Sequence, residues 1–202
     1  MLTNFALGAV ILAAGASARM GRPKMLLPWR GTSVLGHVIQ QWSGRAAQLT
    51  VVHAGEHHPV RGELDRLGFA AEQRILNPHP ELGMFESVRS AARWSGWRKA
   101  ITHAALILGD QPLIKEETLD QLIAFAQSHR DTVCQLVQGG HRRHPVVFPL
   151  ATFGELARTN SATLKEFLEP IRQRTALCEC DDAGLSLDLD RPEDYVEALK
   201  WM

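Results

Sequence analysis

The glycine-rich segment at residues 12–24, LAAGASARMGRPK, carries groups that could bind phosphate. Gly15 and Gly21 can adopt backbone angles that turn N–H groups toward an anion. Arg19 provides a forked donor and Lys24 a compact ammonium, and both suit phosphate oxygens. The spacing matches neither the dinucleotide-binding fingerprint nor the Walker A loop. The segment is therefore either a phosphate-binding loop or a surface turn whose two cations are solvated.

A carboxylate that could hold a divalent cation follows a second apolar run. Asp110 ends AALILGD, directly after Gly109. Mg²⁺ that accompanies a triphosphate is held by one or two carboxylates together with phosphate oxygens. We interpret Asp110 as a metal ligand rather than a helix cap, because KEET at residues 115–118 is a better start for the following helix.

The segment SLDLDRPEDY, residues 186–195, places Asp188 and Asp190 on one side of an alternating stretch. Pro192 and Glu193 resemble the first turn of a capped helix, so we interpret Asp190 as its cap. Asp188 has no such competing role. It is therefore predicted to be the second metal ligand.

Predicted strands and helices alternate along the chain around these residues. Helical spacing of apolar residues predicts helices that include Val34 to Trp42, Val88 to Ala92 and Leu119 to Ala126. Short apolar runs predict strands at 8–14, 48–53, 104–109, 132–137 and 176–180. This alternation indicates a three-layer α/β domain, and no linker or repeat divides residues 1–202. The segment RRHPVVFPLATFGELA departs from the pattern because of its prolines, which favour an edge strand or an irregular lobe.

Composition narrows the function classes. The 202 residues carry 22 basic and 22 acidic side chains and 45% hydrophobic residues. This balance predicts one globular core and neither nucleic acid nor a membrane surface as the main partner. Because no apolar run is long enough for a membrane span and no signal peptide is apparent, we expect a cytoplasmic protein. His53, His57 and His58 are predicted to lie in a solvated loop rather than a metal site, because their spacing does not share a helix face.

Taken in order, LAAGASARMGRPKMLLPW, LGDQPLI, RHPVVFP and LDLDRPEDY resemble the MobA-like nucleotidyltransferases, and among them the CTP:molybdenum cofactor cytidylyltransferases. The resemblance covers residues 8 to 198 and implies a Rossmann-like α/β/α sandwich with a mostly parallel sheet. It implies that Arg19 and Lys24 hold phosphates and that Asp110 and Asp188 bind Mg²⁺, with Mn²⁺ as the alternative. The residues that it places along the nucleotide are Leu12, Ala13, Ala14, Gly15, Asn77, Gly83, Ser87 and Gly109.

Two further features of the resemblance concern the substrates. Relatives that use GTP have L-A-G-G in the first loop, so Ala14 points to CTP. Where relatives have glycine before the His-Pro pair, this chain has Arg143, and a more basic acceptor pocket is one consequence. For His144 two interpretations stay open: it holds the turn before the proline, or it contacts the acceptor substrate. For Gly83 and Ser87, a plain helix cap is the alternative to anion binding.

The resemblance implies transfer of CMP from CTP to the terminal phosphate of a molybdopterin-type cofactor, with a molybdoenzyme as the expected partner. Two alternatives stay open at this point. One is the same chemistry on a sugar phosphate or another phosphorylated small molecule, because acceptors are recognised by variable loops. The other is a non-catalytic protein that binds the nucleotide or cofactor and hands it to a molybdoenzyme.

Overall fold

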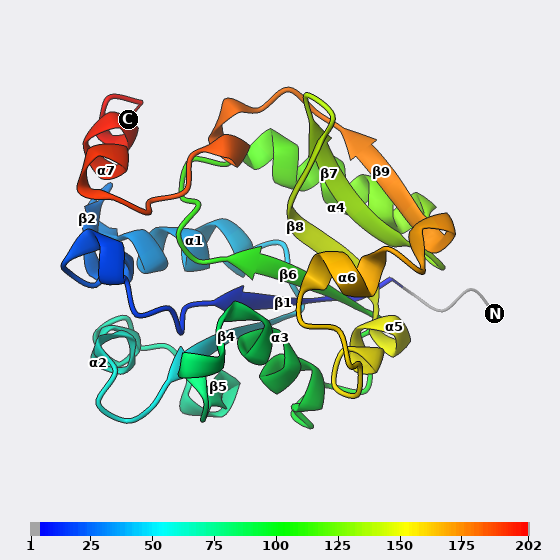
Figure 1. Ribbon diagram of the computed structural model, residues 1–202, viewed down its shortest axis with the longest axis horizontal. Coiled ribbons are helices and arrows are strands. Elements are labelled where there is room, and N and C mark those ends of the chain that lie inside the picture. The colour runs from blue at the N-terminus through cyan, green and yellow to red at the C-terminus, as the bar shows by residue number, and fades with distance from the viewer. Residues whose placement is uncertain (1–4, 202) are drawn as a thin grey trace.

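A computed structural model describes residues 5–201, and in that part of the chain seven strands form one central sheet (Figure 1). The strand order is β5-β4-β1-β6-β8-β7-β9. All neighbouring strands pair in parallel except β8, which is antiparallel to both β6 and β7. These strands are β1 (Leu7–Leu12), β4 (Gln48–Ala54), β5 (Arg74–Asn77), β6 (His103–Leu108), β7 (Val133–Gln138), β8 (His141–Pro149) and β9 (Thr175–Glu179).

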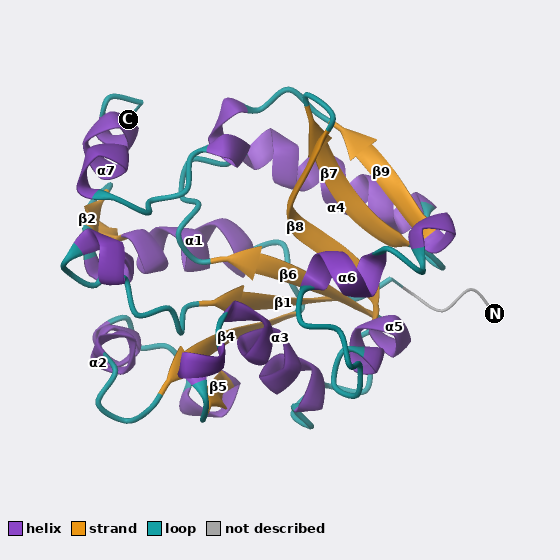
Figure 2. Ribbon diagram, viewed as in Figure 1, coloured by secondary structure: helices purple, strands orange, loops and turns teal. Residues whose placement is uncertain are grey.

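Helices cover both faces of the sheet, as the secondary-structure colouring of Figure 2 shows. One face packs against α1 (Val34–Ser43), α2 (Pro59–Arg66) and α4 (Glu116–Ser128). The other face packs against α3 (Met84–Arg93), α5 (Leu150–Glu155) and α6 (Leu164–Leu168). The predicted three-layer α/β/α sandwich with a mostly parallel sheet is therefore confirmed.

The central strands are apolar on both faces because both faces are covered. In β1, Ala9 and Ile11 belong to one hydrophobic cluster, whereas Val10 and Leu12 belong to the cluster on the opposite face. The five predicted strands correspond to β1, β4, β6, β7 and β9, and the three predicted helices to α1, α3 and α4. The four-residue strand β5 was not predicted.

The prediction of an edge strand or irregular lobe for RRHPVVFPLATFGELA is wrong. Its first half forms β8, which lies inside the sheet between β6 and β7, and its second half contains α5. Pro145 is tolerated there because the ladder is interrupted: the pairing of β7 with β8 shifts between Gln135 and Leu136. A proline, which lacks an N–H donor, is accommodated at such a bulge.

A third, smaller cluster joins the C-terminal helix α7 (Pro192–Leu199) to the segment after β1. Trp29 in the short strand β2 (Pro28–Trp29), which pairs with β3 (Thr32–Ser33), is fully buried near Tyr195 of α7. The Tyr195 hydroxyl donates to the Pro28 carbonyl at 2.6 Å. These contacts hold the chain just before α7 beside the glycine-rich loop.

The three histidines predicted to lie in a solvated loop have different surroundings. His57 is exposed, but His53 is buried at the end of β4 and His58 is half-buried immediately before α2. The prediction of a solvated position is therefore wrong for His53, because this residue belongs to β4 and its side chain is buried in the sheet. Among residues 5–201, no helix is long and apolar enough to cross a membrane.

Candidate active site

The glycine-rich loop leaves the carboxyl end of β1 and folds back on itself. Ser17 adopts a left-handed backbone conformation with φ of 54°, and Gly21 follows with φ of 65°. The Ser17 hydroxyl accepts the backbone N–H of Lys24 at 3.1 Å. This bond closes the loop and directs the Lys24 side chain toward the end of β6, where Asp110 lies.

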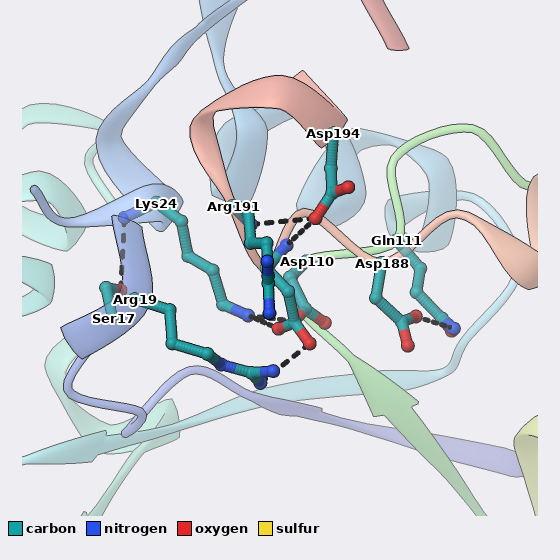
Figure 3. Close-up of polar contacts among 9 residues, drawn as sticks. Ser17, Arg19, Lys24, Asp110, Gln111, Asp188, Arg191 and Asp194 are labelled. Atoms are coloured by element: carbon teal, nitrogen blue, oxygen red, sulfur yellow. Dashed lines mark hydrogen bonds and ion pairs between the residues drawn. The ribbon is translucent and has the colours of Figure 1, made fainter. Parts of the chain in front are cut away.

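Lys24 lies between two carboxylates that come from distant parts of the chain (Figure 3). Its ammonium forms ion pairs with Asp110 and, at 3.0 Å, with Asp190. Arg19 contacts the other oxygen of Asp190 at 2.7 Å. The Lys24 and Asp110 side chains are only 12% and 15% exposed, whereas Arg19 is 65% exposed and therefore free to reorient toward a ligand.

The electrostatic balance of the cluster keeps Lys24 and Asp190 charged. Burial by itself would lower the pKa of Lys24, but the negative charges of Asp110 and Asp190 raise it above its ordinary value. Burial opposes ionisation of Asp190, but Lys24 and Arg19 hold the pKa of this carboxyl below its usual range. At neutral pH Lys24 and Asp190 therefore present a positive and a negative group that face each other.

Asp188 lies on the same side of the site and is the most exposed of the three aspartates. Its carboxylate accepts a hydrogen bond from Gln111 at 2.6 Å (Figure 3). Partial desolvation raises the pKa of Asp188 and the nearby charges of Asp110 and Asp190 add to this rise, while Gln111 opposes it. A carboxylate whose ionised form is disfavoured in this way gains from a bound cation.

The segment that carries Asp188 and Asp190 is tied to the loop that carries Asp110. The Leu189 N–H donates to the Asp110 carbonyl at 3.3 Å. Earlier in the same segment, the buried carboxylate of Asp182 accepts three hydrogen bonds. Its donors are the Lys115 N–H at 2.8 Å, the Thr118 hydroxyl at 2.7 Å and the Gly184 N–H at 2.9 Å.

The interpretation of Asp190 as a helix cap is wrong. The helix α7 begins at Pro192 after the N-cap residue Arg191, and the acid that caps it is Asp194. The Asp194 carboxylate accepts the N–H groups of Asp190 and Arg191 at 3.1 Å and 2.7 Å. The Asp190 side chain is thus left to pair with Arg19 and Lys24.

These groups border a cavity of about 430 Å³ at the carboxyl ends of β1 and β6, the edge where parallel α/β sheets bind ligands. The glycine loop, the start of α3 and the aspartates meet there. Its lining residues are Leu12, Ala14, Gly15, Ala16, Lys24, Met25, Pro80, Gly83, Met84, Ser87, Leu108, Asp110, Asp188 and Asp190.

Two of the residues predicted to contact the nucleotide do not line this cavity, but support the residues that do. Ala13 is fully buried and packs in the core between the sheet and the helices α1, α2 and α4. Gly109 allows β6 to approach β1: its N–H donates to the Leu12 carbonyl at 3.1 Å, and a side chain at Gly109 would lie 2.9 Å from that oxygen. A larger residue would push Asp110 away from the loop.

Asn77 is also predicted to contact the nucleotide, and its amide is engaged within the protein. Asn77 is fully buried, donates to the Ser87 hydroxyl at 2.9 Å and accepts the His79 N–H at 2.9 Å. Ser87 and Gly83 both line the cavity, and Gly83 is the N-cap of α3 with φ of 91°. Asn77 therefore fixes the start of α3 against the end of β5.

Arg143 and His144 lie in β8, outside the cavity lining. His144 Nδ1 is 3.5 Å from the Leu106 carbonyl, and burial lowers the pKa of this imidazole. The Nε of Arg143 is buried with no hydrogen-bond partner among residues 5–201. Their predicted contact with the acceptor stays a prediction.

The carboxylates of Asp110 and Asp188 suit a divalent cation that is also coordinated by the phosphates of a substrate. Within residues 5–201, no group of three or more His, Cys, Asp or Glu side chains is arranged to hold a metal ion by itself. Asp110 and Asp188 nevertheless line one cavity, and oxygen ligands of this kind suit Mg²⁺ or Mn²⁺. One or two carboxylates plus substrate phosphates are the usual arrangement for such an ion.

The sequence and the structure of this chain were compared with those of known proteins. The family model of the MobA-like NTP transferase domain matches residues 9–176. The chain belongs to this family. This MobA-like protein is a nucleotidyltransferase, and its glycine loop and Asp110 fall within the matched region.

Individual relatives match this MobA-like chain over almost its whole length. It is 25% identical to the molybdenum cofactor cytidylyltransferase of Escherichia coli strain K12, over 96% of this chain and 95% of the relative. The crystal structure of an Rv0371c homologue from Mycobacterium sp. strain JC1 superposes with a TM-score of 0.75 at 26% identity, covering 96% and 95% of the two chains. Rv0371c of Mycobacterium tuberculosis, solved in complex with manganese, superposes with a TM-score of 0.66 at 26% identity, covering 96% and 98%.

Three residues that sequence reasoning missed or misassigned organise the site. Asp190 was assigned to the helix, although its alternation with Asp188 already placed both on one side. Gln111 directly follows Asp110 and could have been noticed as a polar neighbour. Asp182 carried no sequence signal, because its three donors are distant in sequence or lie two residues away.

Proposed function

We propose that this protein transfers the CMP group of CTP to the terminal phosphate of a molybdopterin-type cofactor and releases pyrophosphate. The observation that carries the proposal is the convergence of Lys24, Asp110 and Asp188 on one cavity that the glycine loop also lines. The full-length similarity to a molybdenum cofactor cytidylyltransferase supports this choice of substrates. We further propose that residues 1–202 act as a single domain.

In the proposed reaction an oxygen of the acceptor phosphate attacks the α-phosphorus of CTP. The bond from the α-phosphorus to the bridging oxygen breaks, and that oxygen leaves with pyrophosphate. The nucleophile is already an oxyanion, so no general base is required, and the protein contributes alignment and charge neutralisation. No covalent intermediate with the protein is formed.

Lys24 and Arg19 are the groups that stabilise charge on the leaving pyrophosphate. Lys24 is held in place by Asp110 and Asp190, so its ammonium needs little reorganisation when the phosphates arrive. Arg19 is mostly exposed and can turn its fork from Asp190 to phosphate oxygens. The N–H groups of the glycine loop add donors on the same side.

Asp110 and Asp188 are the residues that would hold Mg²⁺. The bound ion would reduce the repulsion between the acceptor phosphate and the triphosphate. Gln111 keeps the Asp188 carboxylate oriented through its 2.6 Å hydrogen bond. The manganese complex of the mycobacterial relative supports a divalent cation in this fold.

The choice of CTP depends on Ala14, which is 6% exposed and lines the cavity. Its methyl group takes up space that glycine leaves free in the relatives that use GTP. We expect Ala14→Gly to raise kcat/KM for GTP relative to CTP, because the larger purine gains room. An unchanged ratio would count against this assignment of the base site.

The test of the proposed function is pyrophosphate release from CTP, GTP and ATP by the purified protein in the presence of Mg²⁺. Each nucleotide is paired in turn with molybdopterin-type cofactor, a sugar phosphate and a polyol phosphate. Release that requires both CTP and the molybdopterin-type cofactor is the expected result. Turnover with a sugar phosphate instead would show that the acceptor is a sugar phosphate. Binding of nucleotide or cofactor without turnover would favour a non-catalytic accessory role.

A further inference from the structure

The two cations predicted to hold phosphates, Arg19 and Lys24, are both paired with carboxylates of the protein. The Lys24 ammonium contacts the Asp110 carboxylate and lies 3.0 Å from Oδ1 of Asp190. The Arg19 guanidinium lies 2.7 Å from Oδ2 of the same Asp190. Figure 3 shows the Arg19 and Lys24 side chains extending from the glycine loop toward the same place. Asp190 is therefore the carboxylate that both cations share.

The cavity of the candidate active site has more carboxylates than cations. Among the described residues that line it, Asp110, Asp188 and Asp190 are acidic and Lys24 is the one cation. Arg19, which pairs with Asp190 from outside this lining, adds a second positive charge. A carboxylate repels a phosphate group at close range, and the repulsion is larger where burial reduces screening by water. A triphosphate without a metal ion therefore meets a lining in which negative groups outnumber positive ones.

The backbone on both sides holds Asp190 in place. The Asp190 N–H donates to the Asp194 carboxylate at 3.1 Å, and the Leu189 N–H donates to the Asp110 carbonyl at 3.3 Å. The Leu189 side chain is fully buried in the cluster that α7 forms with the segment after β1. The Arg19 side chain is 65% exposed, so it is the partner that can move when the ion pair opens. The negative charge of Asp190 thus stays beside the cavity when Arg19 turns to a ligand.

We propose that Asp190 is a specificity-determining residue that makes the site prefer the metal complex of a triphosphate over the metal-free triphosphate. A triphosphate has to displace Asp190 from Lys24 and Arg19, and it then lies beside the negative charge of this carboxylate. The complex with Mg²⁺ carries two fewer negative charges, so Asp190 repels it less. The inference rests on the proposed function only in taking a nucleoside triphosphate as the ligand.

The test compares the affinities of three variants and the wild-type protein by titration calorimetry at one pH. Asp190→Asn removes the charge at nearly constant size, and Asp190→Glu keeps the charge. Glu193→Gln removes the same charge from an exposed position in the first turn of α7 and is the matched control. Tripolyphosphate, CTP, GTP and ATP are titrated with Mg²⁺ and, separately, with EDTA.

We expect Asp190→Asn to bind metal-free tripolyphosphate about tenfold more tightly than the wild-type protein, because two partly exposed ion pairs no longer compete with the ligand. The Mg²⁺ complex gains only about threefold, because it carries roughly half of the negative charge of the free ligand. The preference for the metal complex therefore falls about threefold in Asp190→Asn. It is retained in Asp190→Glu and in Glu193→Gln. CTP follows tripolyphosphate, because Asp190 acts on the phosphates and not on the base.

Equal affinities of the wild-type protein and Asp190→Asn for metal-free tripolyphosphate would overturn the inference. Weaker binding of Mn²⁺ by Asp190→Asn, measured by electron paramagnetic resonance, would also overturn it, because Asp190 would then be a metal ligand. If Asp190→Asn lowers the midpoint of urea unfolding, Asp190→Ser replaces it and has to meet the same expectations.

The outcome for the proposed function is separate. The expected effect of Asp190→Asn in a protein that turns over ATP or GTP but not CTP would refute the proposed function and support the role of Asp190. A wild-type protein that binds no triphosphate, with or without Mg²⁺, would refute both.

Discussion

Replacement of Asp182 by alanine should destabilise the protein and weaken its active site together. The Asp182 side chain is 1% exposed and accepts hydrogen bonds from the Lys115 N–H, the Thr118 hydroxyl and the Gly184 N–H. Removing the carboxylate leaves three donors without a partner at the start of α4 and in the turn before Asp188. An unpaired buried donor costs roughly 1–3 kcal/mol, and water entering the cleared space recovers part of this.

We therefore expect Asp182→Ala to lower the free energy of unfolding by about 3–5 kcal/mol. For a chain of this size, each kcal/mol shifts Tm by about 2–4 °C, so Tm should fall by roughly 6–20 °C. Urea unfolding followed by tryptophan fluorescence measures the free energy, and a thermal scan measures Tm. Asp181→Ala, which changes the exposed neighbouring aspartate, is the matched control.

The same substitution should also reduce turnover at temperatures where the variant is fully folded. Asp182 joins the start of the segment that carries Asp188 and Asp190 to the start of α4, which follows the loop that carries Asp110. When this connection is lost, the carboxylates are held less exactly and alignment suffers. A free energy of unfolding within 0.5 kcal/mol of the wild-type value, taking about 0.5 kcal/mol as the usual range of surface substitutions, would refute this reasoning.

The other predictions concern charge, metal and pH. Asp110→Asn should abolish pyrophosphate release without unfolding the protein, and normal turnover in this variant would exclude Asp110 from the site. Lys24→Met should reduce kcat/KM by about 10²–10³, the usual effect of removing one preorganised charge-stabilising group, whereas a loss below tenfold would contradict the role of Lys24. Removal of divalent cations with EDTA should stop turnover, and added Mg²⁺ or Mn²⁺ should restore it; activity that persists in EDTA would contradict the metal requirement. Burial lowers the pKa of His103 and His144, so the unfolded chain binds protons more readily than the folded protein near pH 6.5. The free energy of unfolding should therefore fall as the pH decreases from 8 to 5.5. Equal free energies of unfolding at the two pH values would show that these histidines do not contribute.

The placement of β8 shows where reasoning from sequence reached its limit. The prolines of RRHPVVFPLATFGELA favoured an edge strand or an irregular lobe. The structure places the first half of this segment between β6 and β7, with the irregularity at Pro145 absorbed by a shift in register. Strand order is decided by pairing between segments that are distant in sequence, and a single sequence does not record that pairing.

The assignment of Asp190 failed for a more local reason. The capping pattern was placed on Asp190 and Glu193, whereas the helix starts one residue later, with Arg191 as N-cap and Asp194 as the capping acid. Helix starts are commonly uncertain by one or two residues from sequence. Here that shift decides whether Asp190 caps a helix or pairs with Lys24 and Arg19.

Local patterns along the chain are enough to predict several features of this protein. The apolar runs specify buried strands, the glycines and Ser17 permit the loop to fold back, and Asp110 follows a strand whose end must lie at the ligand-binding edge. Which charged side chains meet depends instead on contacts between distant segments. Lys24, Asp110 and Asp190 come together because α7 packs on Trp29 and Asp182 ties the last segment to α4, contacts across more than 60 residues that no local pattern encodes.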